Sequence, residues 1–496
     1  MLGISLLLAA MLADVSQCEA IAKVPLQNTT VTSARWIDAG PMVSPAPANA
    51  GGAQAPSTAP PMLPAHCRIA IVMRPSSDSH IEADVWLPAE WNGKFQAVGN
   101  GGWAGSISYP AMARALREGY ATASTDTGHK GGNSTFAIGH PEKLIDFGYR
   151  AVHEMAVQSK AIINAFYKRA ARLSYWNGCS TGGRQGLMAA QRYPDDFDAI
   201  LAGAPANNHS RMNASRLAVS VPAVRDAAAA VPAAKLALVT RAVLDACDGR
   251  DGVKDGFLND PRACIFDVAR LQCVTGDADS CLTAPQIETM KRAYAPVKLA
   301  HGELVFPGKE PGSETAWAMV NGTADALSMS ALQLAHGDTA WDPKTFDLAR
   351  DLALVLEKVG YAVNAVDPDL RAFKARGGKL LLYHGWNDGL ISAGNTVNYY
   401  DTVLKTMGRG QDDWLRLFMA PGMGHCQGGA GPDQVNWMAS LERWRESGKA
   451  PDRIDAARVA GNRVEMTRPL CPYPQIAKYT GIGSTNDAQN FVCAAK

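Results

Sequence analysis

Short apolar runs that end in glycine-containing turns recur along this chain of 496 residues. Four of them lie in the first half, at residues 95–98, 121–124, 173–176 and 200–202, and two more follow a long interruption, at residues 379–383 and 415–419. They give a repeated theme of strand, turn and helix. Uniformly apolar strands that alternate with helices are typical of a parallel sheet covered on both faces. The pattern therefore predicts an α/β fold with a mostly parallel sheet.

Two further runs and the interruption complete the predicted layout. Residues 68–73 and 81–87 are rich in β-formers and are separated by polar turn residues, which predicts antiparallel strands at a sheet edge. The theme stops near Asn208 and resumes near Lys379. The interruption is Ala-rich and helical at first and then rich in loops, which indicates an inserted lid. We predict a catalytic domain over residues 18–207 and 371–496, and a lid domain over residues 208–370.

The N-terminus carries the apolar run at residues 6–12, which is too short to span a bilayer but long enough for the core of a signal peptide. We expect a signal peptide region over residues 1–17; the alternative is a buried helix. No Lys or Arg precedes the run, which points to a natural start further upstream. We find no other stretch that resembles a membrane span. The formal charge of +1 and the lack of a basic stripe interleaved with aromatic residues give no indication of a nucleic-acid partner.

The chain has ten cysteines and no C-x-x-C pair, which favours disulfides in an oxidising compartment over a zinc site. We therefore expect a secreted or periplasmic protein. Three pairs lie within a loop's reach in sequence, although sequence alone does not establish their connectivity: Cys247 and Cys264, Cys273 and Cys281, and Cys471 and Cys493.

The motif Gly-Cys-Ser-Thr-Gly at residues 178–182 follows a predicted strand and precedes a predicted helix. This context is that of a nucleophile elbow, in which small flanking residues let the chain fold back around a strained serine. The alternative is an ordinary glycine-rich turn. We predict Ser180 as a nucleophile. The backbone N–H groups of Thr181 and of the Gly101/Gly102 turn, preferably Gly102, are the candidates for an oxyanion hole.

A serine hydroxyl needs a base and an orienting acid, which follow the serine in the order acid, then His, in this type of fold. Asp388 lies beyond the strand predicted at residues 379–383, and His425 lies beyond the one at residues 415–419. The rival histidines, His129 and His384, both precede the acid. We therefore predict Ser180, Asp388 and His425 as a triad.

Two cysteines flank the predicted triad. Cys179 directly precedes Ser180, and Cys426 directly follows His425. If the serine and the histidine lie within hydrogen-bond reach, the two cysteines are also neighbours, so a disulfide between them would tie the two catalytic loops together. Two buried free thiols are the alternative.

An acidic, glycine-rich loop over residues 248–257 carries Asp248, Asp251 and Asp255. Three carboxylates in one loop repel unless a cation neutralises them, and calcium takes carboxylates together with backbone carbonyls. The spacing is not that of an EF-hand. By spacing alone, a structural calcium site and a pair of solvated Asp-Gly turns are equally compatible.

These motifs resemble the tannase and feruloyl esterase family, which includes mono(hydroxyethyl) terephthalate hydrolases. The resemblance rests on residues 175–186 (YWNGCSTGGRQG), 190–198, 125–129, 384–388 (HGWND) and 424–426 (GHC), and it spans about residues 65–495. It implies an α/β-hydrolase core, a large lid, the Ser–Asp–His triad and a disulfide between Cys179 and Cys426.

The resemblance also implies site residues that the patterns alone do not. It implies a lid calcium held by the Asp248, Asp251 and Asp255 side chains and the Val253 and Phe257 carbonyls, with no organic cofactor. His384 and Ile391 match positions that line the acyl pocket, and Trp317 ends a lid segment, residues 311–317, that we also assign to the pocket. The remaining disulfides would be Cys18–Cys67, Cys247–Cys264, Cys273–Cys281 and Cys471–Cys493.

The lid departs from terephthalate-type relatives, which place an Arg there to clamp a free carboxylate. Residues 331–346 contain no Arg. We therefore expect a secreted serine esterase that acts on small neutral aromatic esters such as feruloyl, coumaroyl or galloyl esters, as a monomer or homodimer, without nucleic-acid or membrane partners. The alternatives are a terephthalate-monoester or polyester hydrolase, a serine peptidase on the same scaffold, and a non-catalytic, calcium-stabilised secreted binding protein.

Overall fold

The predicted strand–turn–helix theme is present in the computed structural model, which describes residues 14–43 and 60–495. The chain forms two units, Met1–Ile200 and Leu201–Lys496. The expected signal peptide region lies mostly outside the described residues; of it, residues 14–17 belong to a helix that runs to residue 20. The predicted lid, residues 208–370, lies wholly within the second unit, and its bounds stay a prediction.

The first unit is built on a sheet whose strands follow the order β1-β4-β5-β7-β6-β8. The pairs β1/β4, β4/β5 and β5/β7 are antiparallel, whereas β6 pairs in parallel with β7 and with β8. The elements are β1 (Thr29–Ile37), β2 (Gly40–Pro41), β3 (Met62–Leu63), β4 (His66–Met73), β5 (Ile81–Pro88), β6 (Lys94–Val98), β7 (Ala121–Thr125), β8 (Leu173–Cys179), α2 (Tyr109–Arg117), α3 (Pro141–Ile145), the π-helix η3 (Asp146–Arg150), α4 (Ala151–Tyr167) and α5 (Thr181–Arg192). The predicted antiparallel pairing of β4 with β5 is thus confirmed, but neither is an edge strand, because β1 forms the edge of the sheet.

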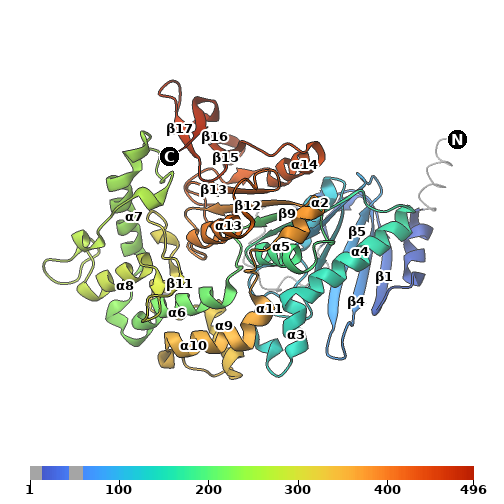
Figure 1. The fold of residues 1–496 in the computed structure, drawn as a ribbon, viewed down its shortest axis with the longest axis horizontal. Helices are drawn as coiled ribbons and strands as arrows, with labels where there is room; N and C mark the ends of the chain where they lie inside the picture. The colour runs from blue at the N-terminus through green and yellow to red at the C-terminus, as the bar shows by residue number, and fades with distance from the viewer. Residues whose placement is uncertain (1–13, 44–59, 496) are drawn as a thin grey trace. The chain divides into compact units, whose positions relative to one another are not determined.

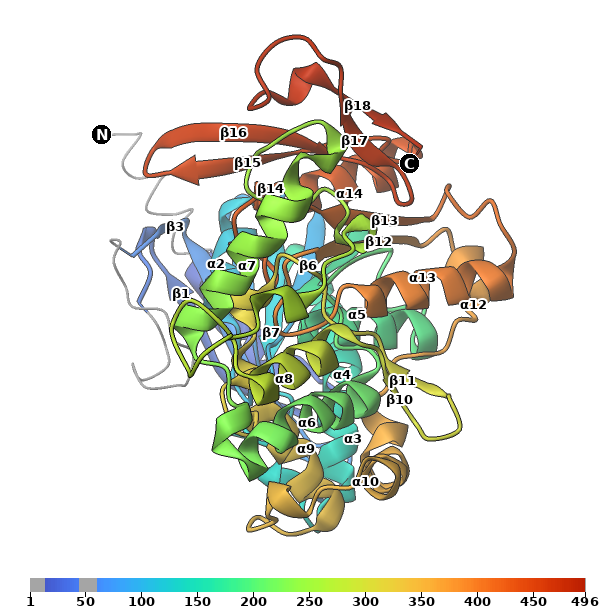
Figure 2. The same cartoon turned by 90° about the vertical axis from the view of Figure 1, so that its left-hand side faces the viewer.

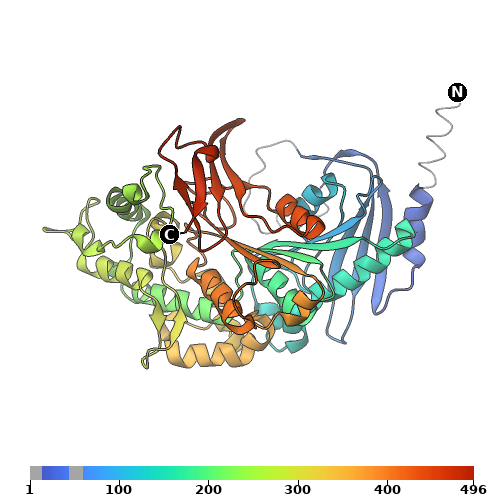
Figure 3. The ribbon, with the colours of Figure 1, turned by 45° about the horizontal axis from the view of Figure 1, so that its top comes forward.

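Burial explains why the apolar runs become strands. All five residues of β7 are buried, as expected for a central strand that is covered on both faces. Helices α2 and α4 lie on opposite faces of this unit's sheet (Figures 1 and 3). Helix α2 buries Met112, Ala113 and Leu116, while its basic residues remain at the end of the helix. The α/β class predicted from the sequence is confirmed.

The second unit contains the later strands and most of the helices. Strand β9 (Ala199–Gly203) enters it and lies beside β12, which pairs in parallel with β13 from Leu380↔Leu415 to Gly385↔Ala420. The other elements are α6 (His209–Arg225), α7 (Ala233–Cys247), α8 (Ala284–Tyr294), β10 (Val297–Lys298), β11 (Leu304–Phe306), α9 (Ala326–His336), α10 (Leu348–Val355), the π-helix η11 (Leu356–Gly360), α11 (Tyr361–Val363), α12 (Arg371–Ala375), β12 (Lys379–Gly385), α13 (Gly394–Met407), β13 (Leu415–Ala420), β14 (Gln434–Val435), α14 (Trp437–Ser447), β15 (Ile454–Ala460), β16 (Arg463–Leu470), β17 (Ile476–Tyr479) and β18 (Phe491–Ala494).

Within this unit the helices α6, α8, α9 and α10 gather at one end, and the antiparallel ribbons β15–β16 and β17–β18 lie at the other (Figure 2). The inserted helices have a core of their own, to which α7 contributes Leu236, Val239 and Val243. That separate core agrees with an insertion that folds around its own apolar side chains.

Helix α7 also corrects one sequence prediction. The helical stretch Ala227–Asp251 contains an 18-residue window with a mean hydropathy of 1.5, so by length and composition it could span a membrane, and the prediction that no other stretch resembles a membrane span was wrong. The regular helix within this stretch has only 15 residues, however, and its apolar side chains pack into the insertion's core. Because the core helices of soluble proteins share this composition, we interpret α7 as a core helix.

Candidate active site

The turn between β8 and α5 holds Ser180 in a strained backbone conformation. Its φ is 64° and its ψ is −122°, a region that L-residues rarely occupy. A Cβ atom at Gly178 would lie 2.4 Å from the Gly182 carbonyl oxygen, so the turn closes only because glycine stands there. This geometry is that of a nucleophile elbow, as the motif predicts.

The proposed oxyanion residues lie together at the start of α5. The Thr181 hydroxyl donates a hydrogen bond of 2.8 Å to the Gly102 carbonyl, which joins the glycine turn after β6 to the helix N-terminus. The Gly182 N–H donates to the Asn100 carbonyl at 2.8 Å, which adds a second link between the same two segments. The structure thus brings Gly102 and Thr181 together, and free N–H groups at a helix N-terminus suit a developing negative charge.

In the second unit, Asp388 and His425 form a direct pair. The loop after β12 places Asp388, and the loop after β13 places His425, whose Nδ1–H donates to Asp388 Oδ2 at 2.7 Å. Asp388 is completely buried. Burial alone would raise the pKa of Asp388, but the charge of His425 and the hydrogen bonds from both histidines hold that pKa well below its ordinary value. The predicted acid and base are therefore in contact.

A second histidine contacts the same acid. His384 Nε2 lies 3.0 Å from Asp388 Oδ2, and His384 Nδ1 lies 2.7 Å from the Thr396 hydroxyl on α13. Chain order had excluded His384 as the base, and the resemblance had placed it in a substrate pocket; neither argument indicated this contact. No spacing in the sequence marks Thr396 as its partner.

The three side chains expected to line a substrate pocket are buried, and their pocket role stays a prediction. His384, Ile391 and Trp317 are at most 2% exposed. Trp317 belongs to the insertion's core, and its indole N–H donates to the Ser313 hydroxyl at 2.8 Å. None of the three side chains therefore offers an exposed wall to a substrate.

The three carboxylates of the acidic loop all have partners within the protein. Asp248 accepts the Gly256 N–H at 3.0 Å, Asp251 accepts the Val253 N–H at 3.0 Å, and Asp255 pairs with the buried Arg468. Among the described residues, no three His, Cys, Asp or Glu side chains are grouped so as to hold a metal ion. Burial raises the pKa of Asp255 to about 6, although the charge of Arg468 opposes the rise. The donor chemistry suits a hard cation, but the side chains as placed do not form a finished metal site.

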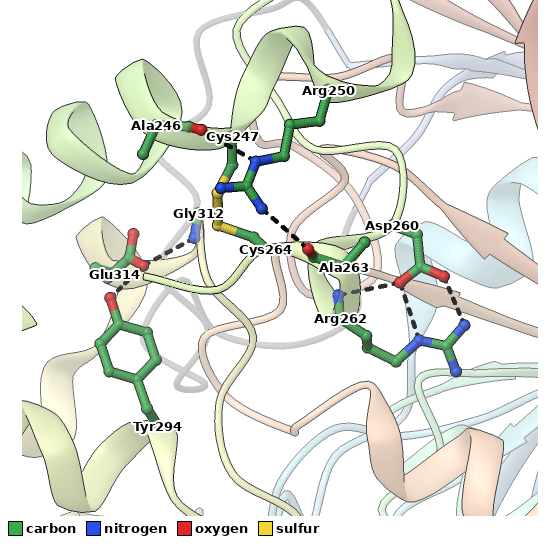
Figure 4. The surroundings of a disulfide bond; sticks show 10 residues. All are labelled: Ala246, Cys247, Arg250, Asp260, Arg262, Ala263, Cys264, Tyr294, Gly312 and Glu314. Carbon is green, nitrogen blue, oxygen red and sulfur yellow. Dashed lines mark hydrogen bonds and ion pairs between the residues drawn. A yellow bond between two sulfur atoms is a disulfide. The ribbon is translucent and has the colours of Figure 1, made fainter. Parts of the chain in front are cut away.

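A disulfide anchors this loop to the following turn. Cys247 and Cys264 are bonded, and Arg250 lies across them, donating to the Ala246 and Ala263 carbonyls (Figure 4). Three other pairings implied by the resemblance are also present, Cys18–Cys67, Cys273–Cys281 and Cys471–Cys493. These four pairings are confirmed.

Comparisons with known proteins agree on one family. The family model described as "Tannase and feruloyl esterase" matches residues 67–494. An uncharacterized esterase of Xanthomonas campestris pv. campestris is 36% identical, over 96% of this chain and 91% of its own length. A probable feruloyl esterase B-2 of Aspergillus terreus is 34% identical, over 96% and 95%. The crystal structure of feruloyl esterase B from Aspergillus oryzae superposes with a TM-score of 0.91 at 32% identity, over 97% of this chain and 100% of that one.

Proposed function

The chain belongs to the tannase and feruloyl esterase family and is a carboxylic ester hydrolase, and on that premise we propose that Ser180 is its nucleophile, His425 its base and Asp388 the acid that orients the base. The observation that carries the proposal is the strained elbow at Ser180. The 2.7 Å bond between His425 and Asp388 supports it, because a base needs such a partner to present its other nitrogen to the serine. The proposal requires the serine loop and the histidine loop to meet.

The reaction would proceed through an acyl-enzyme. Ser180 Oγ attacks the ester carbonyl while His425 Nε2 takes its proton, and Asp388 holds the Nδ1–H of the imidazolium that forms. The N–H groups of Gly102 and Thr181 would bind the oxyanion. The alcohol leaves with the proton from Nε2. Water activated by the same nitrogen then attacks the acyl carbonyl, which releases the acid and restores Ser180.

We propose small aromatic carboxylic esters, feruloyl or galloyl esters among them, as the substrates. The names of the Aspergillus relatives support this choice. The absence of Arg from residues 331–346 supports a neutral acyl group over a free carboxylate. Terephthalate monoesters remain the competing substrate class.

A hydrolysis panel tests both parts of the proposal. Methyl ferulate, methyl gallate, a terephthalate monoester and a short p-nitrophenyl ester would be compared for the wild type, Ser180→Ala and the control Ser174→Ala. Ser174 is a buried serine on the same strand, so its replacement reports general damage to β8. We expect Ser180→Ala to lose about 10⁴-fold or more of kcat on every substrate and Ser174→Ala to keep it. Retained activity in Ser180→Ala would refute the nucleophile, and a preference for the terephthalate monoester would refute the acyl group.

We also propose a disulfide between Cys179 and Cys426 that ties the two catalytic loops together. Its support is that the other eight cysteines pair among themselves and that no described cysteine is a free thiol. Proteolysis without reductant should release one cross-linked peptide pair that contains both residues. Alkylation of either thiol before reduction would contradict the bond.

The acidic loop and the cysteines support two further proposals. We propose that Asp248, Asp251 and Asp255 can bind calcium beside a cavity of about 370 Å³, two of whose lining residues are Asp248 and Asp251. Binding by all three requires Asp255 to leave Arg468.

We further propose a secreted or periplasmic location, because disulfides persist in oxidising compartments.

A further inference from the structure

The carboxylate of Asp388 is held by more than the base it is proposed to orient. Its Oδ1 accepts the N–H groups of Leu390 and Ile391, at 2.7 and 2.9 Å. Its Oδ2 is approached by two imidazoles, those of His425 and His384. Three of these four contacts do not involve His425, so the orientation of the Asp388 carboxylate does not depend on the base alone.

The contacts of His384 determine which of its nitrogens carries the proton. Nε2 faces two groups that can only accept, the ionised Asp388 Oδ2 at 3.0 Å and the Ile391 carbonyl at 3.2 Å. Nε2 must therefore be protonated. In the neutral ring Nδ1 then carries a lone pair, and the Thr396 hydroxyl, 2.7 Å away, can donate to it. Thr396 thus satisfies the remaining lone pair of the tautomer that can hold the acid.

We infer that His384 is a positioning residue for Asp388, which its Nε2–H fixes in the orientation that His425 needs, and that Thr396 supports this tautomer by donating to Nδ1. The inference rests on the proposed function, because it gives His384 a role in the same site. It replaces the pocket role that the resemblance implied. A histidine with no exposed surface and both ring nitrogens engaged by the protein cannot contact a substrate directly.

Sharing Oδ2 between two imidazoles has an electrostatic consequence. Each N–H takes up part of the carboxylate's negative charge, so the loss of His384 would leave more of that charge on His425. The protonated form of His425 would then be favoured, and the acidic limb of the pH profile of kcat/KM would move to higher pH. The other charged groups that act on Asp388 are the buried Lys309 and Arg216, which the substitutions below leave unchanged.

Four variants separate the loss of a hydrogen bond from the loss of side-chain volume. His384→Phe keeps a buried ring but has no donor, while His384→Gln keeps an N–H close to the position of Nε2. Thr396→Val removes the hydroxyl at almost constant shape, and Thr396→Ser keeps it. His66→Phe serves as a matched control, because His66 is another buried histidine, 2% exposed, in the first unit. Melting temperatures of all five variants show whether they fold.

The kinetic outcome distinguishes the roles. We expect His384→Phe to lower kcat by about 10- to 100-fold, which is the effect of one hydrogen bond to a charged group, with KM changed by less than about threefold. The acidic limb of the pH profile of kcat/KM should move to higher pH by roughly one unit. His384→Gln and Thr396→Ser should recover most of kcat, and His66→Phe should move neither readout. Unchanged kcat and acidic limb in His384→Phe would overturn the inference, as would a changed KM or substrate preference at unchanged kcat.

A spectroscopic measurement tests the tautomer without any substrate. In protein labelled with ¹⁵N-histidine, the signal lost in His384→Gln should show an Nε2–H tautomer, and in Thr396→Val the Nδ1 resonance of that signal should shift because Nδ1 has lost its hydrogen-bond donor. An Nδ1–H tautomer in the wild type would overturn the inference. Failure of the proposed function looks different: all esters would remain intact, or Ser180→Ala would stay active, while the tautomer signal still reported the contact between His384 and Asp388.

Discussion

Arg468 is the cation that neutralises the acidic loop, so its removal should destabilise the second unit strongly. Its guanidinium is 3% exposed and pairs with Asp255, a residue 213 positions away in sequence. It also donates to the Thr485 carbonyl and lies 3.9 Å above the Phe491 ring. We consider Arg468→Met, which keeps an apolar side chain of similar length over Phe491 but removes the charge and both hydrogen bonds.

The expected loss follows from what the substitution leaves behind. Removing one partner of a buried ion pair costs about 3–5 kcal/mol, because the remaining charge stays buried and unpaired. Here the remaining Asp255 also has Asp248 and Asp251 as like-charged neighbours. We therefore expect Arg468→Met to lose about 3–5 kcal/mol of unfolding free energy in chelator. The double variant Arg468→Met/Asp255→Asn should recover part of this loss, because the unpaired charge is gone.

Urea unfolding in chelator and in calcium provides the assay. Without Arg468, Asp255 loses its ion-pair partner. Calcium at a free concentration of 100 Kd should then stabilise the variant by about 2.7 kcal/mol, and the same calcium concentration should stabilise the wild type less. An unfolding free energy within about 0.5 kcal/mol of wild type in chelator would refute the electrostatic reasoning. Equal stability of Arg468→Met with and without calcium would contradict the calcium proposal.

Three further predictions use other parts of the structure. A methyl group at Gly203 would lie 2.2 Å from the buried Tyr383 ring, so Gly203→Ala should lower the free energy of unfolding by about 1–3 kcal/mol or more. Urea unfolding would measure this loss, and an unchanged midpoint would contradict it. Burial lowers the pKa of His129 to about 4. As the pH drops from about 6.5 to 4, the unfolded chain therefore takes up a proton at this residue before the folded protein does, and the stability of the fold decreases. The melting temperature of His129→Gln should decrease less than that of the wild type over this range, and an equal decrease would refute the prediction. Asp388→Asn should lower kcat by about 10⁴-fold with little change in KM, and near-normal kcat in the hydrolysis panel would exclude Asp388 as the acid.

The sequence predicted the strands that carry the site because their apolar residues run together and end in glycine-containing turns. Strands β6, β7, β8, β12 and β13 lie where the apolar runs predicted them. Strand β1, whose residues are all half-buried or exposed, gave no such signal and was not predicted, and neither was the ribbon β15–β16. Chain order selected Asp388 and His425, which are in contact.

What the sequence missed depends on contacts between distant residues. The spacing of the acidic loop was equally compatible with a calcium site and with a pair of solvated turns, and neither interpretation included the ion pair between Asp255 and Arg468 on β16. The resemblance assigned His384 a position near the acyl pocket, but a family match does not give the partners of its ring nitrogens. Thr396 and Ile391 become those partners only when α13 and its preceding loop fold back against β12.

Covalent labelling of Ser180 tests the central claim most directly. The wild type would be treated with a fluorophosphonate probe, and the modified peptide would be identified by mass spectrometry alongside Ser180→Ala and Ser174→Ala. The account predicts one label per chain, on Ser180, in the wild type and Ser174→Ala, and none in Ser180→Ala, with loss of esterase activity in step with labelling. A label on another residue, or an active enzyme that stays unlabelled at Ser180, would contradict it.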